Sequence, residues 1–302
     1  MLTVRSVSRS YGDRRVLDDV SFDVRPGRMT GFVGANGAGK TTAMRIILGV
    51  LAAHGGEVRW NGAPVTPSTR MRFGYMPEER GLYPKMKVAD QIVYLGRLHG
   101  LDAARARRNT DELLGRLGLT ERAGEPVENL SLGNQQRAQI AAALVADPEL
   151  LILDEPFSGL DPLAVETVLG VLRDRAADGT PVLFSSHQLD VVERLCDDVV
   201  IIAEGAIAAA GEREELRSRF AARRFELVVD ADTGWVRDVP GVRIVDLDGP
   251  RAVFELVDDD SGRLDPADER EQEILQAAVA KGPVRVFRPV LPSLAEIFRE
   301  VV

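Results

Sequence analysis

A glycine-rich segment that ends in a lysine and a threonine carries the clearest chemistry in the sequence. Residues 34–41 read Gly-Ala-Asn-Gly-Ala-Gly-Lys-Thr and match the pattern G-x-x-x-x-G-K-[ST]. Glycines let backbone N–H groups curl around phosphate oxygens, and the N-terminus of a following helix adds partial positive charge. Lys40 would reach the β- and γ-phosphates, and Thr41 would offer a hydroxyl to Mg²⁺. The segment predicts a nucleoside triphosphate site.

Two adjacent carboxylates follow a short apolar run. Leu150–Leu153 is typical of a strand buried in a parallel sheet, and Asp154 and Glu155 come directly after it. Successive side chains of a strand point to opposite sides, so we expect one carboxylate to hold hydrated Mg²⁺ and its neighbour to face the water that attacks the γ-phosphate. Such a pair is also common in surface turns. Its combination with the triphosphate loop favours the catalytic interpretation.

A third segment, Leu-Ser-Leu-Gly-Asn-Gln-Gln-Arg at residues 130–137, opens a predicted helix over 135–146. Ser131 would cap this helix. The free N–H groups at an exposed helix N-terminus also attract anions. Together with the Ser131 hydroxyl and the Gly133 backbone, they predict an anion site. Because the triphosphate loop already serves the phosphates of its own chain, this second anion site predicts a dimer with ATP between the protomers. His187 follows another predicted strand, at the sheet edge where ligands bind in open α/β sheets.

The elements that must position these residues alternate between strands and helices, which predicts an α/β core. Residues before 29 alternate apolar and polar side chains, as in short antiparallel strands. We expect helices over residues 40–51, 88–98, 105–117, 135–146 and 163–177, and strands over 29–33, 150–153, 182–186 and 199–203.

The C-terminal part predicts a second, smaller domain. After a helix over 213–220, its order is strand 225–229, a short helix near Trp235, strands 242–247 and 252–257, helix 269–281 and strand 284–287. This order is typical of ferredoxin-like α+β domains. We therefore expect domains at 1–220, with a helical subdomain at about 85–146, and at 221–302. Residues 258–262 predict a solvated loop and not a calcium site, since the ligand spacing of such sites is missing.

Composition excludes several classes of protein. The net charge of -9 offers no attraction to a phosphate backbone, so we expect no nucleic-acid partner. A single cysteine, Cys196, forms no intrachain disulfide and fits a reducing compartment; we expect it to be a buried helix residue. Charge-free stretches such as 179–189 stop short of the ~20 apolar residues of a membrane helix, and the N-terminal residues predict no signal peptide.

Together these motifs resemble those of the ATP-binding-cassette (ABC) ATPases, in the same order, over about residues 1–215. The corresponding family motifs are Walker A around Lys40, Walker B at 150–154, the catalytic glutamate at Glu155, the signature motif at 130–134, the D-loop at 158–161 and the switch histidine at His187. The resemblance implies a P-loop core with antiparallel β and helical subdomains. It also implies ATP and Mg²⁺ as cofactors.

The resemblance further implies that two cassettes meet head to tail, each nucleotide held by Walker A of one and by Ser131 and Gly133 of the other. Glu155 would polarise the attacking water, and His187 would contact the γ-phosphate. Nucleotide contacts are implied for Tyr11 (on the adenine), Gly34, Asn36, Gly37, Ala38, Gly39, Lys40, Thr41, Thr42, Ser131, Gly133, Asn134 and Asp161. Metal contacts are implied for Thr41, Glu78 and Asp154.

Two motifs depart from the family pattern. Glu78 stands where the family usually has Gln, and a carboxylate there can ligate Mg²⁺ but adds negative charge near the γ-phosphate. The signature reads Leu-Ser-Leu-Gly-Asn instead of Leu-Ser-Gly-Gly-Gln. These departures leave room for slow or partner-dependent turnover.

The chain looks similar to the sodium or drug efflux ATPases that pair with ABC-2-type permeases. The similarity lies in Glu78, in the altered signature motif, in residues 79–84 and in the C-terminal residues 292–298. The resemblance implies an ATP-driven exporter subunit at the cytoplasmic face of the membrane, working with a permease and a second cassette, in the simplest case an identical copy. An apolar cluster of Leu82, Tyr83, Pro84 and Met86 is predicted to contact a permease helix; alternatively this loop folds on its own core.

Two other functions stay open at this point. One is a soluble cassette outside transport, such as an assembly scaffold or a translation factor, although translation factors of this family join two cassettes and this chain has one Walker A loop. The other is a degenerate regulatory cassette that binds ATP with little hydrolysis. Glu155 and His187 argue against it, whereas Glu78 and Asn134 leave it open.

Overall fold

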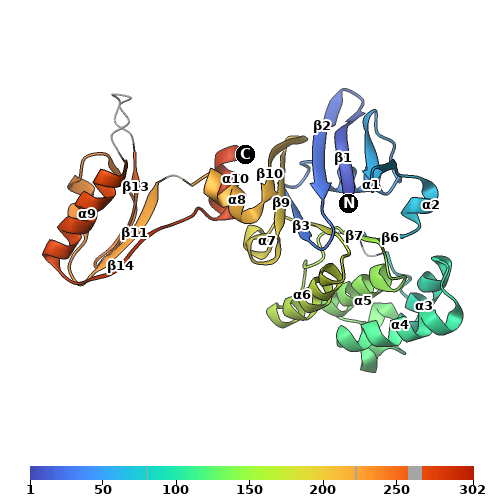
Figure 1. The fold of residues 1–302 in the computed structure, drawn as a ribbon. Coiled ribbons are helices and arrows are strands. Elements are labelled where there is room, and N and C mark those ends of the chain that lie inside the picture. Colours follow the sequence, from blue (N-terminus) through green and yellow to red (C-terminus); the bar gives the residue numbers. More distant parts are fainter. Residues whose placement is uncertain (80, 222, 258–266) are drawn as a thin grey trace. The chain divides into compact units, whose positions relative to one another are not determined.

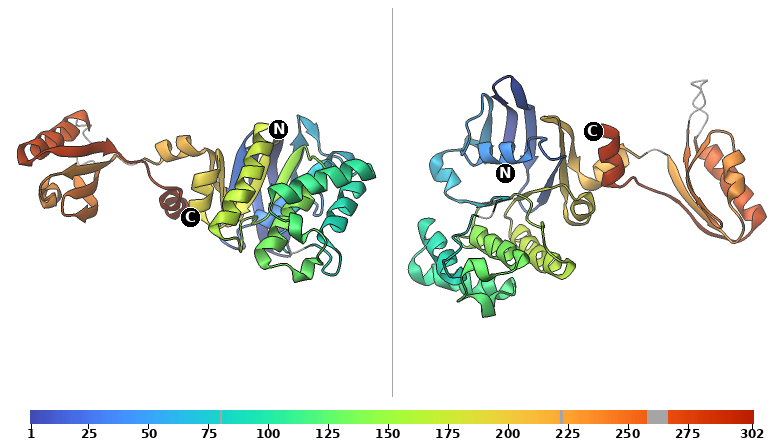
Figure 2. Two further views of the ribbon diagram at one scale, coloured as in Figure 1. Left: turned by 90° about the horizontal axis from the view of Figure 1, so that it is seen from below. Right: turned by 180° about the vertical axis from the view of Figure 1, so that it is seen from behind.

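The computed structural model describes residues 1–79, 81–221, 223–257 and 267–302 (Figures 1 and 2). These residues form two compact units, Met1–Arg213 together with Val301–Val302, and Glu214–Glu300. No helix among the described residues combines the length and the hydropathy needed to cross a bilayer.

A six-stranded sheet forms the centre of the first unit, with strand order β10-β9-β3-β8-β7-β6. All neighbours in it run parallel except β10, which pairs antiparallel with β9. Strands β3, β7 and β8 are buried along their full length, as parallel strands covered on both faces must be. The strands are β3 (Met29–Val33), β6 (Phe73–Met76), β7 (Leu150–Leu153), β8 (Val182–Ser186), β9 (Asp198–Ala203) and β10 (Ala206–Glu212). Their order brings the carboxyl ends of β3, β8 and β7 side by side.

An antiparallel sheet of order β2-β1-β4-β5 packs against the first helix, α1 (Lys40–Ile47). Alternate side chains of this sheet, such as Leu2, Val20 and Val24, are buried against Met44 and Ile47 of α1. The strands are β1 (Leu2–Tyr11), β2 (Arg14–Val24), β4 (Gly55–Trp60) and β5 (Ala63–Pro64). The predicted antiparallel strands before residue 29 are thereby confirmed.

The helices gather into separate regions of the first unit. Helices α3, α4 and α5 lie together, on the side away from β1 and β2 (Figures 1 and 2). The first unit contains α1 (Lys40–Ile47), α2 (Pro67–Arg70), α3 (Val88–Leu98), α4 (Ala103–Arg116), α5 (Leu132–Leu144), α6 (Pro162–Ala177) and α7 (Leu189–Leu195), with 3₁₀ turns at Thr120–Arg122 and Val127–Asn129.

Three predicted helix positions need correction. Helix α1 ends at Ile47 and not near Leu51, because Gly49 turns the chain out of the helix with φ +71°. Helix α5 begins at Leu132, three residues before the predicted start, because Ser131 caps it. Cys196 is buried as expected, but it follows the end of α7 in an extended conformation and is not within the helix.

The second unit is an antiparallel sheet of order β12-β13-β11-β14 with α9 on one face (Figures 1 and 2). This is the strand arrangement of a ferredoxin-like domain, whose first helix is reduced here to a 3₁₀ turn at Gly234–Asp238. Its elements are β11 (Arg224–Val229), β12 (Val242–Asp248), β13 (Arg251–Leu256), α9 (Ala267–Lys281) and β14 (Val284–Pro289), together with α8 (Arg213–Arg219) and α10 (Leu294–Val301), of which one terminal residue each belongs to the first unit. The predicted loop at 258–262 lies outside the described residues.

Candidate functional site

Glycine is the residue that fits at two positions of the loop between β3 and α1. A Cβ on Gly34 would lie 2.4 Å from the carbonyl oxygen of Ile202. Gly39 has φ +114°, and a Cβ there would lie 2.9 Å from the carbonyl oxygen of Val16. Both distances are shorter than a side chain tolerates, and the conformation of Gly39 is one that L-residues avoid. The loop therefore closes tightly over the start of α1.

Lys40, the first residue of α1, is folded into this loop. Its side chain is buried, and Nζ donates hydrogen bonds to the carbonyl oxygens of Gly34 at 2.7 Å and Ala35 at 3.2 Å. Burial lowers the pKa of Lys40, and the negative charges of Glu155, Asp154 and Glu78 oppose that effect. A cation is thus held beside the N-terminus of α1 and facing three carboxylates.

A cavity of about 520 Å³ collects residues from several segments around Lys40. Ten of the predicted site residues line it: Tyr11, Asn36, Gly37, Gly39, Lys40, Thr41, Thr42, Glu78, Asp154 and Glu155. Arg14 and Val16 also line it and were missed, although they follow Tyr11 closely in the sequence. The guanidinium of Arg9 lies 4.9 Å from the centre of the half-exposed Tyr11 ring. Gly34 and Ala38 belong to the same loop without lining the cavity.

Asp154 and Glu155 both line the cavity, although they lie beyond the strand whose alternation predicts separate roles for them. The strand β7 ends at Leu153, and Glu155 adopts a left-handed conformation with φ +52°, so the alternation of a strand no longer applies. Both carboxylates are buried. Oδ1 of Asp154 accepts a hydrogen bond from Ser185 Oγ, whereas Oδ2 has no partner among the described residues.

His187 lies beside Glu155. Its Nδ1 is 3.0 Å from Oε1 of Glu155, without the alignment of a hydrogen bond, and the His187 side chain is about half exposed. The pair would be an ion pair when the imidazole is protonated. The carboxyl ends of β7 and β8 therefore place a carboxylate and an imidazole in contact, as the sequence predicts for that edge of the sheet.

The other predicted nucleotide contacts lie outside this cavity. Ser131 Oγ accepts a hydrogen bond from the N–H of Asn134 at 3.4 Å and caps α5. Asn134 lines a different cavity of about 460 Å³, together with Arg122 and Arg137. Asp161 caps α6 by accepting a hydrogen bond from the N–H of Ala164 at 2.8 Å. A Cβ on Gly133 would make only ordinary contact, 3.5 Å from the carbonyl oxygen of Gly159.

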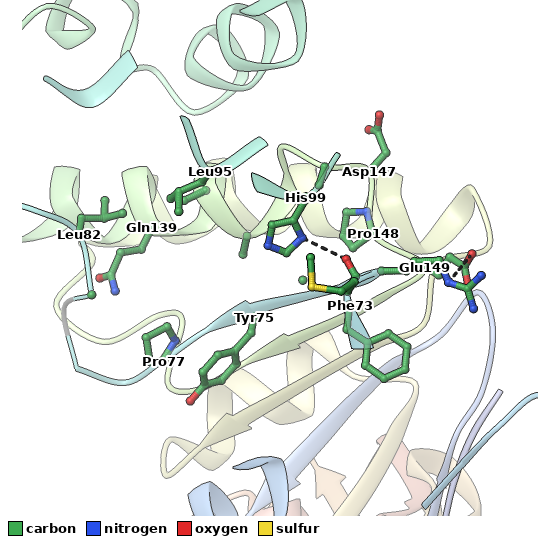
Figure 3. A pocket seen from close by; sticks show the side chains of 17 residues that line it. Phe73, Tyr75, Pro77, Leu82, Leu95, His99, Gln139, Asp147, Pro148 and Glu149 are labelled. Atoms are coloured by element: carbon green, nitrogen blue, oxygen red, sulfur yellow. Dashed lines mark hydrogen bonds and ion pairs between the residues drawn. The ribbon is translucent and has the colours of Figure 1, made fainter. Parts of the chain in front are cut away.

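A third cavity, of about 500 Å³, lies where β6 meets the helical region (Figure 3). Phe73, Tyr75, Leu82 and Leu95 contribute apolar side chains to it, and His99 Nδ1 lies at hydrogen-bond distance, 3.1 Å, from the carbonyl oxygen of Met71. Of the predicted apolar cluster, Leu82 lines this cavity. The neighbouring Tyr83 is 63% exposed.

A P-loop nucleoside triphosphatase is defined by three consecutive features: a parallel strand, a glycine loop without room for side chains, and a helix that begins with a lysine. The segment from β3 to α1 has all three. The comparisons with known proteins specify the family. The family model for the ABC transporter domain matches residues 17–158, and the model for the C-terminal domain of DrrA1-3-like ATP-binding proteins matches residues 211–302.

Relatives of known sequence and structure agree with these models. An uncharacterized ABC transporter ATP-binding protein of Bacillus subtilis, YhaQ, is 38% identical over 100% of this chain and 98% of its own length. The linearmycin resistance ATP-binding protein LnrL of the same organism is 34% identical over 72% of this chain and 71% of its own. A solved ATP-binding subunit of an ABC transporter has a TM-score of 0.68 and 34% identity, and the match covers 73% of this chain and 93% of that one. The chain belongs to the ATP-binding proteins of the ABC transporter family, which hydrolyse ATP.

Proposed function

We propose that this protein is the ATP-hydrolysing subunit of an exporter and that it drives transport through a separate membrane permease. One observation carries the proposal: Lys40, Asp154 and Glu155 converge on a single cavity from α1 and from the end of β7. A cation for the phosphates and two carboxylates for metal and water are the groups that phosphoryl transfer to water requires. Relatives whose names state resistance or export support the direction of transport.

Each residue has a distinct role at this site. Backbone N–H groups of the loop and Lys40 bind the phosphates, and Tyr11 stacks on the adenine. Glu155 polarises the attacking water, and His187 contacts the γ-phosphate. Oδ2 of Asp154, buried and without a partner among the residues that the structure describes, is suited to a cation, and Thr41 and Glu78 add oxygens beside it. Bound Mg²⁺ would supply positive charge to the β- and γ-phosphates.

A second cassette completes the site. Ser131, Gly133, Asn134 and Asp161 do not reach the cavity of their own chain, so we place them against the nucleotide of a partner, in the simplest case an identical copy. The N-terminus of α5 supports this arrangement, because Ser131 is exposed there and donor groups at a helix start attract anions. Leu132 and Leu163, at the starts of α5 and α6, are exposed apolar side chains that a second copy would cover.

The third cavity supports docking of a permease of the ABC-2 type at the cytoplasmic face of the membrane. Its apolar side chains, among them Phe73, Leu82 and Leu95, and the exposed Tyr83 fit the apolar face of an amphipathic helix from another chain. ATP binding would close the two cassettes and hydrolysis would reopen them, so that the docked permease helices move with them.

Substitution of Glu155 by Gln tests the proposal. We expect hydrolysis of Mg-ATP to fall by at least about 10², the usual scale for a positioned general base, while ATP still binds. Glu57→Gln, a carboxylate change on the exposed part of β4, is the matched control and should keep wild-type turnover. Near-normal turnover of the Glu155 variant would remove that residue from catalysis.

The same variant tests the two-cassette site. Saturated with Mg-ATP, it should associate in solution scattering, because the nucleotide is trapped between two copies. If it stays monomeric, and no second cassette protein is found to pair with it, the motor function is refuted.

A further inference from the structure

Glu155 occupies a backbone conformation that an L-residue adopts only when its surroundings hold it there. Its φ is +52°, in the left-handed region where the Cβ crowds the following carbonyl group. Glycine, asparagine and aspartate are the residues that commonly take this conformation, and glutamate is not among them. The contacts that maintain it therefore determine where the carboxylate points.

Ser185 holds the amino side of this residue. Its side chain is fully buried in β8, and its Oγ accepts a hydrogen bond from the N–H of Glu155 at 2.8 Å. The same hydroxyl donates to Oδ1 of Asp154. One oxygen thus orients the backbone of Glu155 and also satisfies Oδ1 of Asp154, whereas Oδ2 has no partner in the described part of the chain.

Gln136 holds the carbonyl side. Its buried side chain extends from α5, and Nε2 donates to the carbonyl oxygens of Glu155 at 2.9 Å and Pro156 at 3.1 Å. Neither bond belongs to a helix or to a sheet. The N–H and the C=O of the same residue are therefore held from two different elements, β8 and α5.

We propose that Ser185 and Gln136 are positioning residues that together hold Glu155 in its left-handed conformation and so aim its carboxylate into the nucleotide cavity. The inference rests on the role of Glu155 proposed above. Loss of either bond frees the chain to relax toward an extended conformation, which turns the carboxylate away from the cavity. Hydrolysis should then fall while the phosphate-binding loop keeps its affinity for ATP.

Single substitutions that remove the Ser185 acceptor or the Gln136 donor test this inference. For Ser185→Ala and for Gln136→Met, which has a similar volume but no amide, we expect kcat to fall by about 10-fold to 100-fold, the scale of a misplaced reacting group. Binding of a fluorescent ATP analogue should be unchanged. Ser185→Thr, which keeps the hydroxyl, should restore kcat.

Two control variants distinguish the loss of Glu155 positioning from the general effect of removing a buried polar group. Thr110→Val removes a buried hydroxyl from α4, and Gln91→Met removes a buried amide from α3. Both side chains bind main-chain carbonyl groups away from Glu155, so both variants should retain wild-type kcat. A loss of ATP binding in parallel with kcat, or no rescue by Ser185→Thr, would overturn the inference.

A double-mutant comparison separates this inference from the proposed function. In the Glu155→Gln background, Gln136→Met should cause no further loss of the residual hydrolysis, because Gln136 acts through the carboxylate that is already missing. An equal loss in both backgrounds overturns the inference. If Glu155→Gln abolishes turnover but the two single variants retain it, the positioning role fails and the proposed function stands. If Glu155→Gln itself retains turnover, the proposed function fails and the inference fails with it.

Discussion

Glu78 adds a third carboxylate to a cavity that already contains Asp154 and Glu155. Triphosphate is strongly anionic, so each uncompensated carboxylate opposes its binding. We predict that Glu78→Gln tightens ATP binding by about fivefold at low salt, the scale of a partly exposed charge pair. The gain should shrink as ionic strength rises. Isothermal titration at two salt concentrations measures both effects, and weaker binding that more Mg²⁺ restores would show that the proposed metal ligation by Glu78 outweighs its charge repulsion.

Residues of the site that are close in sequence could be predicted, and those joined only by folding could not. Gly34–Thr41 and the Asp154–Glu155 pair carry their chemistry within a few positions, so their spacing was sufficient. Ser185 and Gln136 gave no such signal, because each acts through a backbone group of a residue that is distant in the chain. The left-handed conformation of Glu155 was equally invisible, since no glycine or asparagine marks it.

The sheet of the second unit depends on glutamates held between arginines. Glu255 of β13 is buried and pairs with Arg224 at 2.7 Å and with Arg243. Burial raises the pKa of Glu255, but the hydrogen bonds and charges of the two arginines outweigh it, so the pKa lies below the ordinary value. A carboxylate with a lowered pKa stabilises the fold above its unfolded-state pKa of about 4.5, and this contribution is lost as the pH falls through the lower, folded-state pKa.

We therefore predict that Glu255→Gln lowers the free energy of unfolding of the second unit by about 3 kcal/mol at pH 7, because it breaks a buried ion pair. The difference from the wild type should narrow as the pH falls below 4.5, since the wild-type carboxyl is then increasingly protonated. Urea denaturation at pH 7 and in acid measures both values. Asp246→Asn, at an exposed pair with Arg251, is the control and should cost less than about 1 kcal/mol. An equal effect of the two variants would contradict the buried-pair argument.

The loop before α3 carries the proposed permease contact. We predict that Tyr83→Ala reduces co-purification with the permease and removes the permease stimulation of hydrolysis, because a large exposed ring next in sequence to Leu82 is lost. Tyr94→Ala, an exposed tyrosine on α3, is the control. If Tyr83→Ala leaves both properties unchanged, the permease binds elsewhere.

Helices and strands with a clear apolar periodicity in their own sequence were predicted better than strands that form only by pairing with others. Helix α3 begins and ends at the predicted residues, since its apolar periodicity and its punctuation agree. The strands β4, β5 and β6 were missed because they are short and because β4 and β5 are largely exposed. The expected helix near Trp235 is a single 3₁₀ turn, too short for a periodic pattern to distinguish it from an α-helix.

At the scale of the whole molecule, the nucleotide cavity is confined to the first unit. All the residues that line it fall between Tyr11 and Glu155, and the second unit spans Glu214–Glu300. We predict that a chain without residues 214–302 binds ATP as tightly as the full-length protein, as measured by titration calorimetry. Weaker binding by a truncated chain with an unchanged circular dichroism spectrum for its remaining residues would give the second unit a part in nucleotide binding.

The lone cysteine has a practical consequence for following the motions of this protein. Cys196 is buried, its Sγ would lie 2.6 Å from a Cβ placed on Gly31, and burial raises its thiol pKa well above the ordinary value. Maleimide dyes, which need an accessible thiolate, will react far more slowly with the native thiol than with cysteines engineered on the surface. Pairs of dyes on engineered cysteines can thus report ATP-driven closure by energy transfer in the otherwise native sequence. The slow labelling rate of Cys196 itself measures how often α7 opens away from β3.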